Sequence, residues 1–178
     1  MTGMRIPLVV PLLAMTVVVV LSNFLVQFPI NDVLTWGAIT YPFSFLITDL
    51  TTRLHGPGRA RRIVWLGFAL AVLLSIWLAT PRIALASGTA FLVGQLLDIQ
   101  IFQKLRNGSW WRAPLVSSSL GSVMDTALFF TLAFAGTELP WVTLALGDLG
   151  VKLLLAVLAL APFRAVLALA LPMPSARV

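Results

Sequence analysis

The sequence predicts an all-α integral membrane protein, a bundle of about six transmembrane helices, on three observations. Of its 178 residues, 60% are hydrophobic and only 10% are charged, whereas soluble domains carry about a quarter charged residues. The apolar residues form long runs, close to the roughly 20 residues that cross a bilayer. The basic residues lie in short clusters between these runs, which indicates orientation signals and a lipid bilayer as partner rather than nucleic acid.

The apolar runs divide a single membrane domain, 1–178, into spans. The first run follows Arg5 as a signal peptide would, but no small-residue cleavage site follows it, so we expect it to remain as a helix. Pro42 lies inside the second run and is expected to kink it, because proline lacks a backbone N–H. In chain order the predicted spans are about 6–27, 36–54, 63–80, 83–103, 113–135 and 141–163. Helix breakers separate them at Pro29 to Asp32, Gly56 to Gly58, Pro81, Asn107-Gly108 and Gly136 to Pro140.

The basic residues load one side of the predicted bundle. The gaps after spans one, three and five hold a single basic residue, Arg82. Ten lie at the N-terminus, in the gaps after spans two and four, and in the tail: Arg5, Arg53, Arg59, Arg61, Arg62, Lys104, Arg106, Arg112, Arg164 and Arg177. Because positive loops stay inside, both termini are predicted to be cytoplasmic, in a multi-pass protein of the cell's inner membrane.

Charged residues also lie where lipid should be. Asp49, Asp98, Asp125, Asp148 and Lys152 all fall within predicted spans. Each charge at a helix centre costs about 2.5–3.5 kcal/mol on insertion scales. Such residues face a bundle interior or a wet cavity and mark solute or ion pathways. The sequence therefore predicts passage of a small polar solute through the bundle.

Neighbouring polar side chains extend this pattern. Gln95 and Asp98 are three residues apart on one face of span four, near Phe91, with no base one turn away. This spacing favours a binding site there over a structural role. Further polar side chains follow on span five at Ser118, Ser122 and Asp125, and near the outer end of span one at Asn23 and Gln27.

Two charge pairs leave alternatives open. Asp49 and Arg53 are four residues apart near the cytoplasmic end, so they can form a structural or snorkelling pair as readily as a ligand site. Asp148 and Lys152 have the same spacing. They can neutralise each other or bind the solute, and the sequence does not choose between these roles.

Four segments resemble the signature of the queuosine precursor transporters, earlier described as vitamin uptake transporters. They are Tyr41 to Thr51, with Tyr41-Pro42-Phe43-Ser44-Phe45 and Thr48-Asp49; Gly94-Gln95-Leu96-Leu97-Asp98; Trp110-Trp111-Arg112-Ala113-Pro114, followed by Ser117 to Ser119 and Asp125-Thr126; and Asp148 with Lys152. The resemblance covers nearly the whole chain, and the combination is more specific than any one segment.

The resemblance implies import of 7-cyano-7-deazaguanine or its aminomethyl relative for tRNA modification, without a cofactor. One carboxylate can accept the adjacent N–H and amino groups of a guanine-like edge, Gln95 or Lys152 can donate to its carbonyl, and a phenylalanine, Phe102 among the candidates, can stack on the bicycle. A second carboxylate would suit the cationic aminomethyl group. The substrate-binding residues expected are Gln95, Asp98, Asp125, Asp148, Lys152, Ser122, Asn23, Asp49, Phe45 and Phe91.

Two other classes of function were weighed against transport. The chain lacks the residues that an intramembrane enzyme would need, because it has one histidine, no cysteine and neither a serine-hydrolase nor a zinc-protease motif. We therefore expect neither catalytic nor metal-binding residues. A substrate-capture subunit of an ATP-driven vitamin importer is the alternative function, since six helices would suit it. The oligomeric state stays open, a homo-oligomer included.

Overall fold

The computed structural model describes residues 6–25, 28, 30, 34, 36–78 and 80–170, and over these residues it contains helices and no strand. The predicted all-α membrane fold is therefore confirmed. The helices are α1 (Val9–Leu25), α2 (Trp36–Thr40), α3 (Phe43–His55), α4 (Pro57–Leu78), α5 (Pro81–Leu105), α6 (Arg112–Phe134), α7 (Trp141–Leu158) and α8 (Leu160–Ala170). The residues Arg5, Gln27, Asp32 and Arg177, which entered the sequence analysis, lie outside the described part of the chain.

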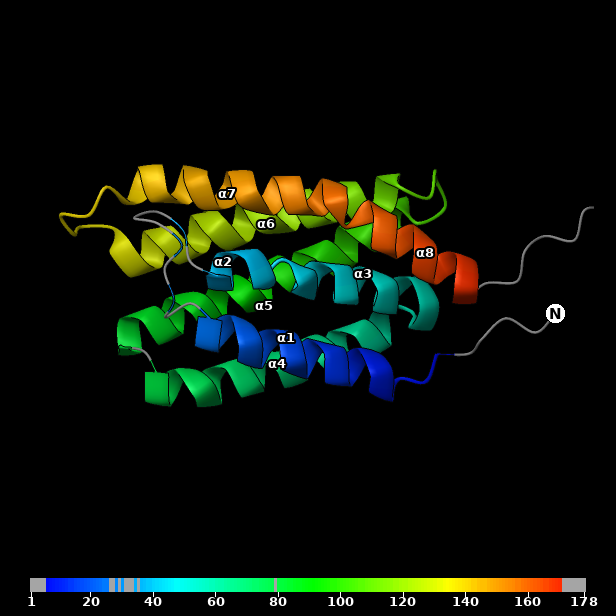
Figure 1. Cartoon of the computed structure of the whole chain (residues 1–178), viewed down its shortest axis with the longest axis horizontal. Helices are drawn as coiled ribbons and strands as arrows, with labels where there is room; N and C mark the ends of the chain where they lie inside the picture. Colours follow the sequence, from blue (N-terminus) through cyan, green and yellow to red (C-terminus); the bar gives the residue numbers. More distant parts are fainter. Residues whose placement is uncertain are drawn as a thin grey trace, which may run out of the picture.

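The helices run along one common long axis. Helices α1 and α4 lie at one side of the bundle, α6 and α7 lie at the other, and α2, α3 and α5 lie between them (Figure 1). Helices α5 and α6 make the most extensive contact. The polar residues of interest therefore sit on helices at the centre of the bundle or packed directly against it.

The outer surface suits lipid. Within the described residues, three helical stretches are long and apolar enough to cross a membrane: Pro81–Leu105, Arg112–Phe134 and Trp141–Ala170. Large apolar side chains point outward from several helices, among them Leu13, Trp77, Leu85, Leu146 and Leu169. A soluble monomer rarely exposes so continuous an apolar surface. Hydrocarbon is the solvent that this surface fits.

Two helical stretches, from Trp36 to His55 and from Trp141 to Ala170, are each broken beside a proline. Helix α2 ends at Thr40, and the backbone N–H of Ser44 bonds to the Tyr41 carbonyl at 2.9 Å, a tight turn that starts α3. The kink expected at Pro42 is thus confirmed. Helices α7 and α8 meet at Ala159. Pro162, in the first turn of α8, has no N–H to donate to the carbonyl of Leu158. This second break was not predicted from the sequence.

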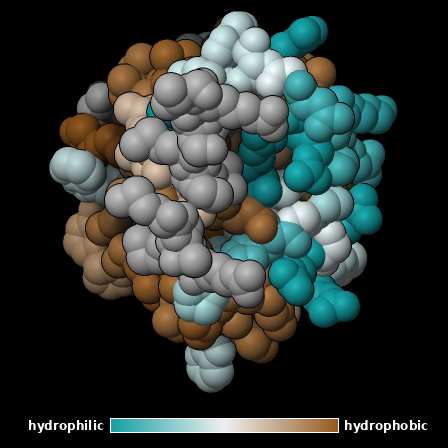
Figure 2. All heavy atoms as spheres, turned by 90° about the vertical axis from the view of Figure 1, so that its right-hand side faces the viewer, coloured by the Kyte–Doolittle hydropathy of each residue, from teal (hydrophilic) through white to brown (hydrophobic). Residues whose placement is uncertain are grey.

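The polar connections gather at one end of the bundle. The start of α1, the α3–α4 junction, the α5–α6 connection and the end of α8 all lie at this end (Figure 1). Figure 2 looks onto it and shows many hydrophilic residues. The exposed bases of this end are Arg59, Arg61, Arg62, Lys104 and Arg112. At the opposite end Arg82 donates to the carbonyls of Leu132 (2.9 Å) and Ala135 (2.6 Å), which serves to cap the end of α6.

This distribution predicts a topology that reporter fusions can measure. A reporter fused after Val178 should be active as a cytoplasmic marker, and one inserted at Thr137, in the α6–α7 connection, should be external. The reason is that basic residues lie mainly in the connections on one side of the membrane, which the positive-inside rule places in the cytoplasm. Arg82, on the other side, is bonded to backbone carbonyls. A C-terminal reporter that is active only outside the cytoplasm would contradict this arrangement.

The contact of α5 with α6 depends on two glycines. A Cβ on Gly121 would lie 2.7 Å from Cε1 of Phe45, 3.1 Å from the Gly94 carbonyl oxygen and 3.3 Å from Cβ of Asp98. A Cβ on Gly94 would lie 3.0 Å from Cβ of Asp125. Small residues let helix backbones approach closely in membranes. Here the approach also brings Asp98 and Asp125 to the same packed region.

Gly121→Ala is therefore expected to destabilise the protein by about 1–3 kcal/mol, the usual cost of overpacking. The added methyl group would collide with the buried ring of Phe45 and the backbone of α5. Thermal unfolding in detergent measures the effect. Gly150→Ala is the matched control, because nothing lies within 4 Å of its Cβ position. An unfolding temperature equal to wild type for Gly121→Ala would show that the close approach is not required.

Candidate functional site

A charged network joins the turn before α3 to helices α6 and α7. Lys152 on α7 forms ion pairs with Asp125 at 2.7 Å and with Asp148 at 2.5 Å, and its ammonium group donates to Thr126 at 3.0 Å. The hydroxyl of Thr126 donates to Asp148 at 2.8 Å, and that of Tyr41 donates to the other oxygen of Asp125 at 2.7 Å. We call these five residues the lysine network.

The lysine network satisfies its own hydrogen bonds. An ammonium group has three donors and no acceptor, and Lys152 has three partners here. Its ammonium also lies 5.3 Å from the centre of the Tyr41 ring, a cation–π contact. Asp148 and Lys152 thus neutralise each other in this conformation. Asp125 joins them as a second carboxylate, which the i, i+4 spacing by itself did not reveal.

Gln95 on α5 is held from both ends of its amide. Its oxygen accepts from the Thr48 hydroxyl at 2.6 Å, and its nitrogen donates to the Ser44 hydroxyl at 2.8 Å. Both partners come from α3, one turn apart. The two bonds orient the amide rigidly, and its nitrogen carries a second N–H that the bond to Ser44 does not use.

Asp49 on α3 bonds across to α6. Ser117 donates to one carboxylate oxygen at 3.0 Å and Ser118 to the other at 2.8 Å. Of the two alternatives left open for Asp49, the structural pair with Arg53 is not formed, because the Arg53 guanidinium donates to the Arg106 carbonyl at 2.6 Å at the end of α5. Asp49 is therefore a buried carboxylate bonded by hydroxyl groups.

Asp98 on α5 differs from Asp49 in its hydrogen bonding. It is 0% exposed, and neither carboxylate oxygen has a hydrogen-bond partner among the described residues. Asp49, Ser117 and Ser118 lie close enough to interact with it electrostatically. Within the described part of the chain, no basic group lies within 4 Å of either Asp98 or Asp49. A buried acceptor without a donor is costly, so it requires an explanation.

Aromatic rings lie beside these polar groups. Phe45 and Phe91 are both 2% exposed and both approach the Tyr41 ring edge-on, at 6.3 Å and 6.2 Å between centres. The Phe45 ring also touches Gly121, next to Asp98. Phe102, in contrast, packs against Phe163 in a separate apolar cluster. Phe45 and Phe91 are thus the rings placed near the polar groups.

Two predicted site residues take other positions. Ser122 is 1% exposed on α6, between Ser118 and Asp125 on the same helix face. Asn23 lies on α1, where its amide donates to the Val19 carbonyl of its own helix at 2.8 Å. Asn23 is thus bonded within a peripheral helix. The structure brings eight other predicted residues to one region of α3, α5, α6 and α7, with Ser122 beside them. These eight are Gln95, Asp98, Asp125, Asp148, Lys152, Asp49, Phe45 and Phe91.

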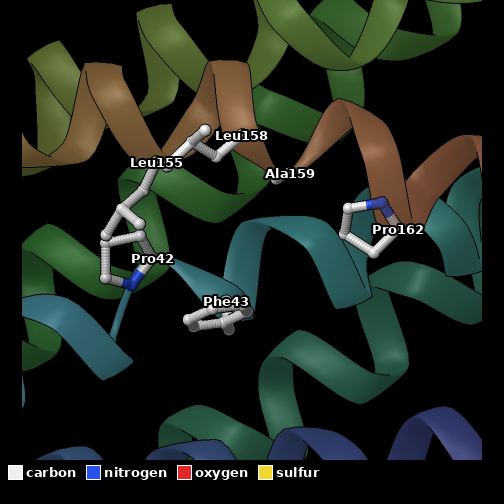
Figure 3. Close-up of a pocket in the computed structure, with 6 residues that line it drawn as sticks. All are labelled: Pro42, Phe43, Leu155, Leu158, Ala159 and Pro162. Atoms are coloured by element: carbon white, nitrogen blue, oxygen red, sulfur yellow. The ribbon is translucent and has the colours of Figure 1, made fainter.

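An apolar pocket of about 180 Å³ lies between the two helix breaks (Figure 3). Its walls come from the start of α3 and from the α7–α8 junction, and none of them is polar: Pro42, Phe43, Leu155, Leu158, Ala159 and Pro162. The polar groups are elsewhere, and Gln95 and Asp98 are fully buried. A solute could reach these two side chains only if helices move, whereas the Asp148 side chain of the lysine network is 15% exposed.

Several partners of the site were not predicted as site residues. Tyr41, Ser44 and Thr48 form a stripe at spacings of three and four, which is a readable signal of one polar helix face. Ser117 and Thr126 had no comparable signal, because small polar residues commonly serve helix packing in membranes. Their roles follow from which carboxylate faces them across the bundle.

Comparisons with known proteins show the family of the chain. The family model described as "Putative vitamin uptake transporter" matches residues 35–80 and 74–167. The chain is 36% identical to the queuosine precursor transporter of Escherichia coli (strain K12), over 84% of this chain and 81% of that protein. It is 33% identical to a probable queuosine precursor transporter of Haemophilus influenzae, over 82% and 79% of the two chains. No solved structure matches the chain. With its apolar helices, this multi-pass membrane protein belongs to the queuosine precursor transporter family.

Proposed function

We propose that the protein imports 7-deazaguanine precursors of queuosine, 7-cyano-7-deazaguanine or its aminomethyl relative, across the cell's inner membrane. The names of its relatives support the substrate class. The ten-to-one charge bias supports an inner-membrane orientation with both termini in the cytoplasm. The purpose of such import is supply of the precursor for tRNA modification.

The observation that carries the proposal is the unpartnered carboxylate of Asp98. A deazaguanine presents an N–H and an amino group side by side, and these can donate to the two oxygens of one carboxylate. Charge-assisted bonds of this kind are short and strong, more so away from water. The spare N–H of Gln95, three residues before Asp98, would donate to the ligand carbonyl. A flat ligand would then lie against Phe45 and Phe91.

The lysine network has a different role in this proposal. Its ammonium donors all have partners, so we assign the carbonyl contact to Gln95 and charge balance to Lys152. Asp125 or Asp148 would face the cationic group of the aminomethyl precursor, and Ser122 completes the α6 wall. The α2–α3 and α7–α8 breaks lie side by side, and discontinuous helices are the places where transporters open toward a central site.

Purified protein in liposomes tests the function. We expect saturable uptake of labelled 7-cyano-7-deazaguanine without ATP and without another protein. Binding assays should rank both deazaguanines above guanine and above vitamins. Tight binding without transport, followed by transport once an ATPase module is added, would instead establish a substrate-capture subunit. Failure to bind either deazaguanine would contradict the proposal.

A further inference from the structure

Substrate binding explains only in part how the buried carboxyl groups of Asp49 and Asp98 are stabilised. A ligand satisfies Asp98 only while it is bound, yet a transporter must also pass through ligand-free states. In those states two carboxyl groups lie against the same stretch of α6 at 2% and 0% exposure. Asp49 of α3 accepts from Ser117 and Ser118, and Asp98 of α5 lies beside Gly121. Two carboxylates in one dry site repel each other, and each loses its hydration.

No cation of the described chain relieves this repulsion. Helix α1 carries no titratable group, and the bases of α4 (Arg59, Arg61, Arg62) are exposed at the bundle end. Arg53 of α3 bonds to the Arg106 carbonyl, and Arg106, just after α5, bonds to Gln103 at 3.1 Å. Arg82 of α5 bonds to the Leu132 and Ala135 carbonyls at the opposite end of the bundle. Arg164 of α8 lies 5.2 Å from the Trp110 ring centre. Lys104 and Arg112 are exposed, and Lys152 of α7 is held by Asp125 and Asp148.

A single proton would relieve both the repulsion between the two carboxylates and the lack of a hydrogen-bond donor for Asp98. If both groups are ionised, Asp98 accepts no hydrogen bond, because the neighbouring Ser117 and Ser118 donate to Asp49. One proton on the pair turns one carboxyl into a donor for the other. It supplies the missing hydrogen bond and removes one of the two buried charges. Carboxyl pairs that share one proton in this way are well known in proteins.

We infer that Asp49 and Asp98 together bind one proton. When the donor edge of a deazaguanine reaches Asp98, that carboxyl must be ionised, so the proton moves to Asp49. This second step rests on the proposed function. The proton stays within the pair rather than leaving it, so the ligand-free and the occupied site carry the same proton.

Infrared spectroscopy of the purified protein without substrate tests the shared proton. We expect the carbonyl stretch of a protonated carboxyl group at neutral pH, sensitive to deuterium exchange. Asp49→Asn and Asp98→Asn should each remove or shift this band. Glu138→Gln, an acid-to-amide change at an exposed loop position, should leave it unchanged. Absence of the band, or a band that neither substitution affects, would overturn the shared proton. This test does not depend on deazaguanine transport.

Discussion

Asp98→Asn is expected to lower the affinity for 7-cyano-7-deazaguanine by well over tenfold. The substitution keeps the shape of the side chain but replaces one of its two acceptor oxygens with a donor, which would face a donor of the ligand. Losing a charged partner in a dry site costs about 2–5 kcal/mol. Binding to the purified protein, by calorimetry or by displacement of labelled ligand, measures the loss.

The fold should survive this substitution, which makes the result interpretable. An asparagine amide at position 98 can donate to Asp49, a partner that a carboxylate there cannot use without a proton. Thermal unfolding should therefore show wild-type or higher stability. Glu138→Gln serves as the control for the loss of a carboxylate at an exposed position. Wild-type affinity in a well-folded Asp98→Asn protein would remove Asp98 from the ligand site.

Lys152→Met is expected to destabilise the protein by about 3–5 kcal/mol, the cost of removing one partner from a buried ion pair. Lys152 is paired with both Asp125 and Asp148, so its loss leaves two carboxylates without a cation. Asp148→Asn should cost much less, since Asp125 and Lys152 remain paired and Thr126 still bonds to the lysine. The unfolding temperatures of the two variants in detergent give the comparison.

A triple variant separates charge balance from ligand binding. Asp125→Asn, Asp148→Asn and Lys152→Gln together remove all three charges while keeping side-chain shapes. Most of the stability lost in Lys152→Met should return, because no charge is left unpaired. Uptake by this variant would show a purely structural network. Loss of uptake in a stable protein would show that the network also binds substrate. Equal stability of Lys152→Met and Asp148→Asn would contradict the three-charge arrangement.

The difference between the predicted pair and the observed network shows what local spacing can reveal. Residues four apart on a helix are neighbours whatever the helix packs against, so Asp148 and Lys152 could be paired from the sequence. The same rule left Asp49 and Arg53 open between a structural or snorkelling pair and a ligand site, and this pair is not formed. A long arginine near a helix end can reach several acceptors, and the Arg106 carbonyl takes this one. Spacing identifies candidates for a bond, and packing selects among them.

The sequence by itself determined the class of the protein and much of its chemistry. Composition and apolar runs require a bundle in lipid, the basic clusters predict its orientation, and four carboxylates within spans mark a polar path. These follow from sequence because the cost of placing a side chain in hydrocarbon depends on its type. Pro42 likewise breaks its helix through its own missing N–H.

Only the tertiary structure decided which polar groups meet. Asp98 lacks a donor because α6 turns Ser117 and Ser118 toward Asp49. Lys152 reaches Asp125 because α7 lies against α6, and Gly94 leaves room for Asp125 where α5 packs on α6. These contacts join residues far apart in the chain, and their partners depend on the rotation and depth of each helix. The balance of buried charges, on which the proposed mechanism depends, is set by that packing.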